Sequence, residues 1–171
     1  MLSIRDTDWA YAAGFVDGEG CIAVARQNVP SRGRYYYSVQ VVVANRDRAV
    51  LDWMRSLWGG YVIAMPGRGT NDRPAWHWRG PSGQNAEPFL LGIAEFLRIK
   101  MPQCENALAM IELSKRSFRT LGPHAMPQEW IDEQEAVYWK QRELNHRGNK
   151  EFVRKAMHSP RAINRSRRVA G

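Results

Sequence analysis

The spacing of apolar residues switches between helical and strand periods along the first part of the chain. Residues 6–18 open with acidic and hydroxyl side chains and continue with apolar residues at helical spacing, which predicts a helix. Apolar and polar residues then alternate over 21–27 and over 35–44, on either side of the turn-forming segment 30–34. This part of the sequence therefore predicts a helix followed by a β-hairpin.

The next part of the sequence has the same kinds of element. Helical spacing over 46–58 ends at Gly59 and Gly60, a typical helix stop, and 61–65 and 75–79 predict a second pair of strands. Further helical patterns occupy 88–98, 103–119 and 127–147. The predicted order is helix, strand, strand, helix, strand, strand, helix, with more helices after it.

Composition and charge favour one domain with a nucleic-acid partner. The chain has 171 residues, a net charge of +8 and a pI of about 9.9. We predict a single domain over 1–157 and a flexible basic tail over 158–171. Cys21 and Cys104 lack the spacing of a zinc site or a disulfide framework. No apolar run is long enough to cross a membrane, so we expect a cytoplasmic protein, and the arginine excess favours a bacterial or phage host over an organelle.

Residues 12–20 read Ala-Ala-Gly-Phe-Val-Asp-Gly-Glu-Gly and combine small residues with two acids. Small residues let two helix backbones approach closely, and Gly18 and Gly20 are expected to release the chain from the helix into a strand. Asp17 and Glu19 would then lie at a helix C-terminus, where the macrodipole opposes negative charge. The two carboxylates need a capping hydrogen bond, a cation or a metal to compensate them.

The segment 12–20 resembles the LAGLIDADG motif of homing endonucleases, matched position by position. The match is not letter-perfect: Ala12 replaces the first leucine, and Glu19 replaces the aspartate that carries the catalytic acid in the family. Glutamate still supplies hard oxygen ligands for a metal. The alternative interpretation is a glycine-rich helix end followed by a strand, without a catalytic role.

The resemblance covers roughly 7–112 and implies an α+β fold of order αββαββα, with additional C-terminal helices. A four-stranded antiparallel sheet would lie on double-stranded DNA with one face and pack on helices with the other. Because the chain has one copy of the motif, the resemblance implies a homodimer whose motif helices pair around a two-fold axis. The residues assigned to this dimer interface are Ala10, Ala13, Gly14 and Asp17.

The resemblance also implies phosphodiester hydrolysis with a divalent metal. We assign Glu19 as the acidic metal ligand and the carbonyl of Gly18 as its neighbour, with Mg²⁺ as the metal, Mn²⁺ as a substitute and Ca²⁺ supporting binding without cleavage. Further catalytic roles fall on Asn45 and Lys100, which would position water or stabilise developing charge. The alternatives are a turn-forming role for Asn45 and a solvated helix end for Lys100.

Strand alternation predicts which side chains face the DNA. Val39, Val41 and Val43 are expected in the core, with Trp76 and Trp78 under the helices. The predicted DNA-binding residues are Ala23, Ala25, Gln27, Arg34, Tyr36, Ser38, Gln40, Val42, Ile63, Met65, Arg68, Arg73, His77 and Arg79. Further candidate phosphate contacts are Arg26, Arg32, Arg46, Arg48, Lys115, Arg116 and Arg119. A register slip of one residue would exchange the two faces of the sheet.

We therefore expect a homodimeric, metal-dependent homing endonuclease that makes sequence-specific double-strand breaks in long pseudo-palindromic sites. Two other functions stay open on the same fold: a DNA-binding regulator that does not cleave, and a maturase-type protein that binds intron RNA. A regulator does not need an acid at position 19, so Glu19 favours the endonuclease. The residues do not distinguish an intron, an intein or a free-standing gene as the coding element.

Overall fold

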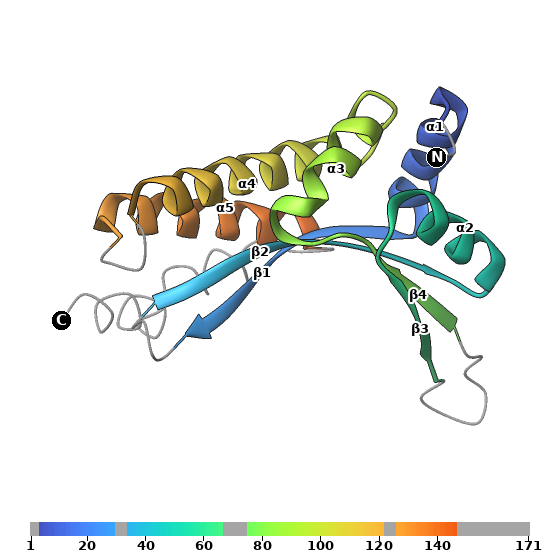
Figure 1. Cartoon of the computed structure of the whole chain (residues 1–171), viewed down its shortest axis with the longest axis horizontal. Helices are drawn as coiled ribbons and strands as arrows, with labels where there is room; N and C mark the ends of the chain where they lie inside the picture. The colour runs from blue at the N-terminus through green and yellow to red at the C-terminus, as the bar shows by residue number, and fades with distance from the viewer. Residues whose placement is uncertain (1–3, 30–33, 67–74, 122–125, 147–171) are drawn as a thin grey trace.

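The computed structural model describes residues 4–29, 34–66, 75–121 and 126–146, and it has an α+β fold. Among these residues, a helical layer covers one face of a single sheet, and no described element covers the other face (Figure 1). The elements are α1 Asp6–Glu19, β1 Gly20–Val29, β2 Arg34–Asn45, α2 Arg48–Trp58, β3 Tyr61–Met65, β4 Ala75–Arg79, the 3₁₀ helix η2 Gly83–Ala86, α3 Glu87–Ala94, α4 Met101–Leu121 and α5 Gln128–Asn145.

The sheet has four strands in the order β1-β2-β4-β3, and every neighbouring pair is antiparallel. The long hairpin of β1 and β2 pairs Gly20 with Val43 at one end and Val29 with Arg34 at the other. The short hairpin of β3 and β4 pairs with the last four residues of β2 only. The predicted four-stranded antiparallel sheet is therefore confirmed.

Alternation along β2 separates the core from the open face. Val39, Val41 and Val43 are buried beneath the helices, and Trp78 of β4 is fully buried on the same side. Trp78 donates its indole N–H to the carbonyl oxygen of Gly59 at 2.9 Å, which fixes β4 against the end of α2. The predicted inward-facing residues are confirmed, so the register of the sheet is the expected one.

Aromatic packing holds α1, α2 and α3 together over the sheet. The Trp9 ring lies 5.2 Å from Trp58 and 6.2 Å from Phe89, measured between ring centroids. A Cβ atom added at Gly92 would approach the Trp9 ring to 2.5 Å, so α3 needs a residue without a side chain at this crossing. These contacts fix the direction in which α1 runs down toward the sheet (Figure 1).

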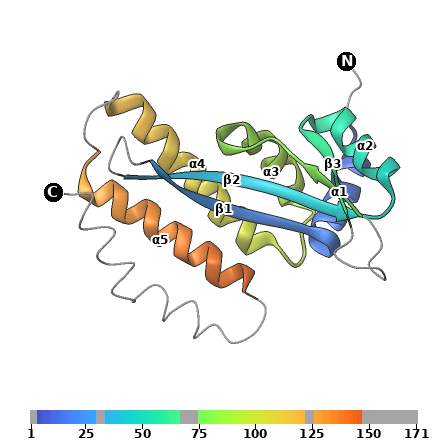
Figure 2. The same ribbon diagram turned by 90° about the horizontal axis from the view of Figure 1, so that it is seen from below.

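Helix α5 lies beside β1 and covers its free edge (Figure 2). The side-chain amides of Gln141 and Asn145 both donate to the backbone carbonyl of Ile22, at 2.7 and 2.8 Å. Asn106 of α4 in turn donates to the amide oxygen of Gln141 at 2.8 Å. The edge carbonyl of Ile22 is thereby satisfied by side chains instead of a neighbouring strand.

Several helix boundaries differ from the sequence prediction, and three of them bear on the site. Helix α1 continues through Glu19, so Gly18 lies inside the helix and the chain leaves it only at Gly20. Helix α2 begins at Arg48 because the Asp47 side chain accepts the backbone N–H of Ala49 and caps it. Helix α3 ends at Ala94, four residues earlier than expected, and the residues after it turn toward α1.

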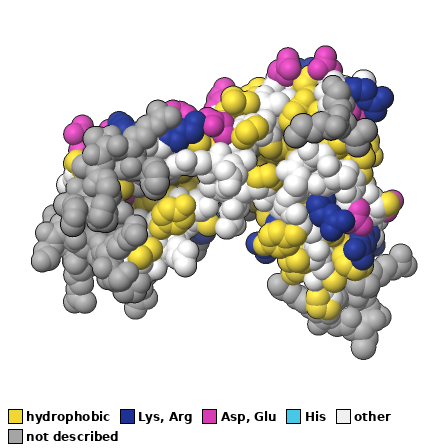
Figure 3. All heavy atoms as spheres, viewed as in Figure 1, with side chains coloured by type: hydrophobic (Ala, Val, Ile, Leu, Met, Phe, Trp, Pro, Cys, Tyr) yellow, Lys and Arg dark blue, Asp and Glu magenta, His cyan; other side chains and the backbone are white. Residues whose placement is uncertain are grey.

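The outline of the molecule is hollowed below the sheet (Figure 3). The hairpin of β3 and β4 bends away from the long hairpin, so the uncovered face of the sheet is concave (Figure 1). The described residues contain no helix with the length and apolar character of a membrane span. Arg32, Arg68, Arg73 and the predicted tail 158–171 lie outside the described residues.

Candidate active site

The end of α1 passes directly into β1 at Gly20. The Gly20 backbone is extended, and a Cβ atom there would lie 2.7 Å from the Cα of Val16. Glycine is therefore required because the chain folds back closely onto α1, and not because of an unusual backbone angle. Glu19 is the last residue of α1, so this turn places it directly before the first residue of β1.

The carboxylate of Asp17 caps the N-terminus of α4. It accepts the backbone N–H groups of Arg98 at 2.7 Å, Ile99 at 3.2 Å and Lys100 at 2.9 Å. These amides precede α4, where the helix dipole presents positive charge. The macrodipole of α1 opposes Asp17, and that of α4 compensates it. The sequence assigned Asp17 to a dimer interface, whereas its carboxylate is engaged within the chain.

Lys100 makes the reciprocal contact. Its ammonium group donates to the carbonyl of Val16 at 2.8 Å and to the carbonyl of Asp17, both in the last turn of α1, where the Val16 carbonyl also accepts the backbone N–H of Gly20. A cation at this position stabilises the negative end of the helix. The alternative of a solvated helix end is wrong for Lys100, because the side chain is half-buried and held against the residues that precede Glu19.

Glu19 has a different environment from Asp17. The side chain is exposed, and within the described part of the chain no hydrogen bond or ion pair is recorded for its carboxylate. The carbonyl of Gly18 follows the two that Lys100 binds, and no described group outside the helix donates to it. An unengaged carboxylate beside an unengaged carbonyl offers the hard oxygen donors that Mg²⁺ uses together with phosphate and water. The described residues contain no cluster of three His, Cys, Asp or Glu side chains.

Asn45 ends β2 in a tight turn. Its side-chain oxygen accepts the backbone N–H of Asp47 at 2.8 Å, which is the turn-forming role that the sequence left as the alternative. The pairing of Gly20 with Val43 carries the end of β2 alongside the end of α1, so Asn45 and Glu19 belong to the same region of the fold. The catalytic role of Asn45 stays a prediction. Because its side-chain oxygen is engaged, the N–H groups of its side-chain amide would have to perform that role.

The exposed face of α1 consists largely of small residues. Ala10, Gly14 and Gly18 are exposed, and Tyr11 flanks them. A Cβ atom added at Gly14 or Gly18 would meet no atom within 4 Å. Ala13, by contrast, is fully buried inside the chain and has no surface to offer a partner, so its assignment to a dimer interface needs correction.

The predicted DNA-binding residues with described side chains lie on the concave face. Cross-strand pairs place Ala23 beside Gln40, Ala25 beside Ser38 and Gln27 beside Tyr36. The second hairpin adds Ile63, Met65, His77 and Arg79 to this face. The side chain of Arg34 lies outside the description.

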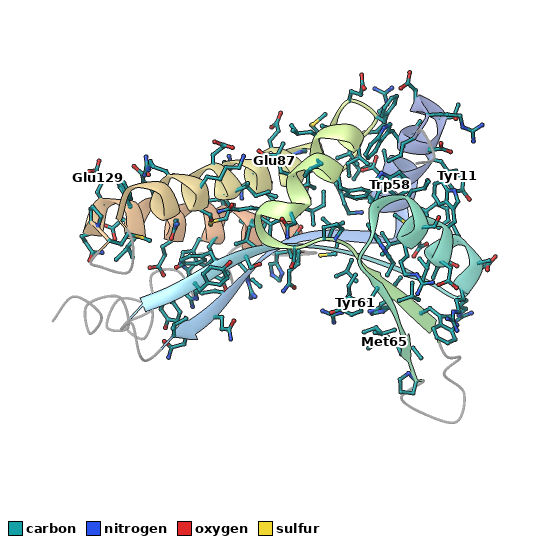
Figure 4. The ribbon with its side chains drawn as sticks, viewed as in Figure 1. Tyr11, Trp58, Tyr61, Met65, Glu87 and Glu129 are labelled. Atoms are coloured by element: carbon teal, nitrogen blue, oxygen red, sulfur yellow. The ribbon has the colours of Figure 1, made fainter. Side chains whose placement is uncertain are left out.

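The sequence analysis missed Tyr61. This residue is 55% exposed and is paired with Arg79, and it projects under the sheet nearer the centre of the molecule than Met65 (Figure 4). The signal was present in the sequence, because Tyr61 shares the parity of Ile63 and Met65 on the same strand.

Several candidate phosphate contacts are paired with acids. Arg26 binds Glu135 at 3.0 Å and lies 4.5 Å from the centre of the Tyr35 ring. Arg48 binds Asp52 at 3.0 Å. Two further pairs join Lys115 to Glu87 and Arg116 to Glu133. A compensated cation attracts phosphate weakly, so these side chains fit a structural role better than the predicted one.

Comparisons with solved structures identify the fold. The chain is similar to the homing endonuclease I-CvuI in complex with the I-CreI target, with a TM-score of 0.65, 19% identity and coverage of 91% of this chain and 96% of that one. It is also similar to the archaeal intron-encoded homing endonuclease I-Vdi141I complexed with DNA, with a TM-score of 0.69, 13% identity and coverage of 97% and 99%.

A third similar structure is larger. The homing endonuclease I-SmaMI, bound to an uncleaved DNA target, matches 91% of this chain with a TM-score of 0.61 and 15% identity, but the match covers only 49% of I-SmaMI. No family model and no curated protein matches the sequence. A further match is named as a LAGLIDADG homing endonuclease, with a TM-score of 0.59 and 17% identity, and it covers 82% of this chain and 46% of that one. The chain therefore has the LAGLIDADG homing endonuclease fold, with the motif itself at the end of α1.

Proposed function

We propose that two copies of this chain form a metal-dependent homing endonuclease that makes sequence-specific double-strand breaks in long, pseudo-palindromic DNA. The observation that carries the proposal is the contrast between the two acids of the motif. Asp17 is fully engaged in capping α4, whereas Glu19 is exposed and unengaged among the described residues. A carboxylate at a helix C-terminus is unfavourable on its own, so its presence there favours a ligand that the single chain lacks.

The concave face supports a DNA partner. It is uncovered, it carries polar and aromatic side chains on both hairpins, and it has a hollowed outline (Figures 1 and 3). Solved structures with the same fold include complexes with DNA. A two-stranded ribbon fits the major groove of B-form DNA, where each base pair presents a distinct pattern of donors and acceptors.

The open side of α1 supports a homodimer. Glycine in a helix interior costs about 1 kcal/mol relative to alanine, yet neither Gly14 nor Gly18 has a neighbour in the chain that excludes a side chain. Close approach of a second helix would explain why glycine is present at both positions. Pairing α1 with its copy about a two-fold axis would bring two Glu19 side chains to the centre of one DNA site.

Four groups of the chain would share the chemistry. Glu19 and the Gly18 carbonyl would hold a divalent cation, which when bound neutralises charge on the scissile phosphate and acidifies a water molecule. Lys100 uses two of its three N–H donors on α1 and has one left to orient a phosphate oxygen or a water. The amide group of Asn45 would hold a water through its N–H donors.

Cleavage of a randomised library of long duplexes by the purified protein tests the proposal. We expect double-strand cuts at one family of sequences with Mg²⁺ or Mn²⁺ and retention without cutting with Ca²⁺. The Glu19→Gln variant should keep specific binding and lose cutting by at least about a hundredfold, the scale of losing one electrostatic group in a catalytic site. Cutting at full rate by this variant would remove Glu19 from the mechanism.

Two alternatives predict different results in the same assay. A DNA-binding regulator would retain specific duplexes without cutting them in any metal. A maturase would bind its intron RNA in preference to duplex DNA. The ion pairs of Lys115 and Arg116 with glutamates compensate basic charge on the helical layer, which weakens the case for RNA there.

A further inference from the structure

One row of side chains crosses all four strands on the concave face. Cys21 of β1 pairs with Val42 of β2, Val42 pairs with Arg79 of β4, and Arg79 pairs with Tyr61 of β3. Neighbouring strands lie about 4.8 Å apart, so Arg79 lies roughly 10 Å across the sheet from Cys21. Cys21 follows Glu19 by two residues, which places the row at the inner end of the concave face, beside the candidate active site.

Among the strand residues of this face whose side chains the structure describes, Arg79 is the one arginine or lysine. It makes no ion pair with a described acid, although most arginines on the helical layer do. Its Nε atom is shielded from solvent and has no hydrogen-bond partner in the described residues. The outward donors are therefore the two terminal nitrogens of the guanidinium group, whose charge is uncompensated.

The backbone around Arg79 is held on both sides. Trp78 is fully buried and its indole is bonded to the Gly59 carbonyl, and Gly80 donates its backbone N–H to Val41 at 3.0 Å. The neighbours of Arg79 in the row are Val42, whose side chain forms no hydrogen bonds, and Tyr61, which brings a single hydroxyl group. The guanidinium group is thus presented from a fixed point on a largely uncharged surface.

On the basis of the proposed function, we propose that Arg79 reads a guanine at the inner end of each half-site, near the centre of the whole DNA site. Two parallel N–H donors match the O6 and N7 acceptors of guanine in the major groove, which is the commonest specific arginine contact with DNA. An arginine that only neutralised phosphate would belong at the rim of the face, where backbone contacts set the register and carry no sequence information. Arg79 lies at the inner end of the face, within the sheet.

A binding selection with the full-length protein on a randomised duplex library tests this assignment. The wild type should prefer G·C at one symmetric pair of positions. In Arg79→Lys and Arg79→Gln that preference should fall by about 5- to 150-fold, while the other positions keep theirs. Lysine keeps the charge but loses the paired donors. An equal loss of guanine preference in the lysine and glutamine variants would therefore identify a bidentate contact. Arg142→Gln, which removes the same charge from an exposed position of α5 away from this face, is the matched control and should leave the guanine preference intact.

Three results would overturn the assignment. Lysine could preserve the guanine preference, or both variants could weaken binding equally at all sequences and lower its salt dependence, which is the behaviour of a phosphate contact. If the wild-type protein selected no sequence, sequence-specific DNA recognition by this face would be refuted. If the protein selected specific sequences but did not cut them, the proposed endonuclease activity would be refuted. The role of Arg79 in base recognition would still be tested. Equal melting temperatures of the variants would exclude misfolding as the cause.

Discussion

The two acids of the motif show how neighbouring residues of similar chemistry take different roles. Asp17 and Glu19 are separated by one glycine, but two positions in a helix differ by about 200° around its axis, so Asp17 points at α4 and Glu19 is left exposed. The sequence predicts that both carboxylates need a capping hydrogen bond, a cation or a metal to compensate their charge. It could not establish that the compensating group for Asp17 is a helix N-terminus about eighty residues away, because that contact depends on tertiary packing.

Replacing these acids by their amides should separate stability from activity. Asp17→Asn places an N–H group against the backbone donors of Arg98 and Lys100, which should lower the free energy of unfolding by about 1–3 kcal/mol. For a chain of this size that corresponds to a fall in melting temperature of roughly 2–12 °C. Glu19→Gln should leave the melting temperature unchanged. Thermal unfolding of both variants followed by circular dichroism checks the prediction, and equal melting temperatures would contradict it.

The two cysteines should differ in their reaction with a thiol reagent. Cys104 is fully buried, and burial raises the pKa of its thiol to about 11, so below that pH the unreactive protonated form dominates. Cys21 is exposed on the concave face. Mass spectrometry after alkylation at pH 8 should find Cys21 modified and Cys104 intact. Specific duplex DNA should protect Cys21, and undiminished modification in the complex would place the DNA elsewhere.

At the scale of elements, the prediction from sequence was good where periodicity is strong. The strands, their alternation and the paired hairpins were recovered because one face of each strand packs on helices and the period of two is unambiguous. The errors fall where tertiary contacts override local pattern. Helix α3 ends early and the residues after Ala94 turn because Asp17 takes the amides of 98–100. The contact of α5 with Ile22 carries no local signal at all.

A side chain at Gly14 should be tolerated in the single chain but not in a dimer whose α1 helices pack against each other. Gly14→Ala should raise the stability of the single chain by about 0.5–1 kcal/mol, since nothing lies within 4 Å of the added Cβ. Gly14→Leu should leave the monomer folded and prevent two α1 helices from packing closely. Sedimentation velocity of the wild type and both variants measures the oligomeric state. A leucine variant that still dimerises would move the interface away from this face of α1.

Helix α5 should position β1 through Asn145. Asn145→Ala removes one of the two amides on the Ile22 carbonyl, three residues after Glu19, and should speed amide hydrogen exchange over 20–24. We also expect slower cleavage at saturating DNA. Gln103→Ala is the matched control. It removes the hydrogen bond that the Gln103 side-chain amide on α4 donates to the carbonyl oxygen of Leu144 at 3.1 Å, and this bond does not involve β1. Each variant should lose about 1 kcal/mol of stability. Identical exchange in the two variants would contradict a positioning role.

At the scale of the whole molecule, most of the net positive charge belongs to the C-terminal part of the sequence. Segment 147–171 holds eight arginine or lysine residues and one glutamate, which accounts for nearly all of the net charge of +8. The described residues, by comparison, pair many of their cations with acids. Under the proposed function, we therefore expect the concave face to supply base recognition and residues 147–171 to supply much of the phosphate affinity.

Neutralising three of these arginines should weaken DNA binding without changing its specificity. Each phosphate contact contributes about 0.9 to the slope of log affinity against log salt, so Arg165→Gln, Arg167→Gln and Arg168→Gln together should lower that slope and weaken binding equally for all sequences. A triple variant at Arg48, Arg55 and Lys115 removes the same charge from ion-paired positions and should change the slope less, because the freed acids lie beside the lost cations. Filter binding at several salt concentrations compares the two. If the paired set had the larger effect, the helical layer would be the phosphate-binding surface, and the orientation of the protein on its nucleic acid would have to be reversed.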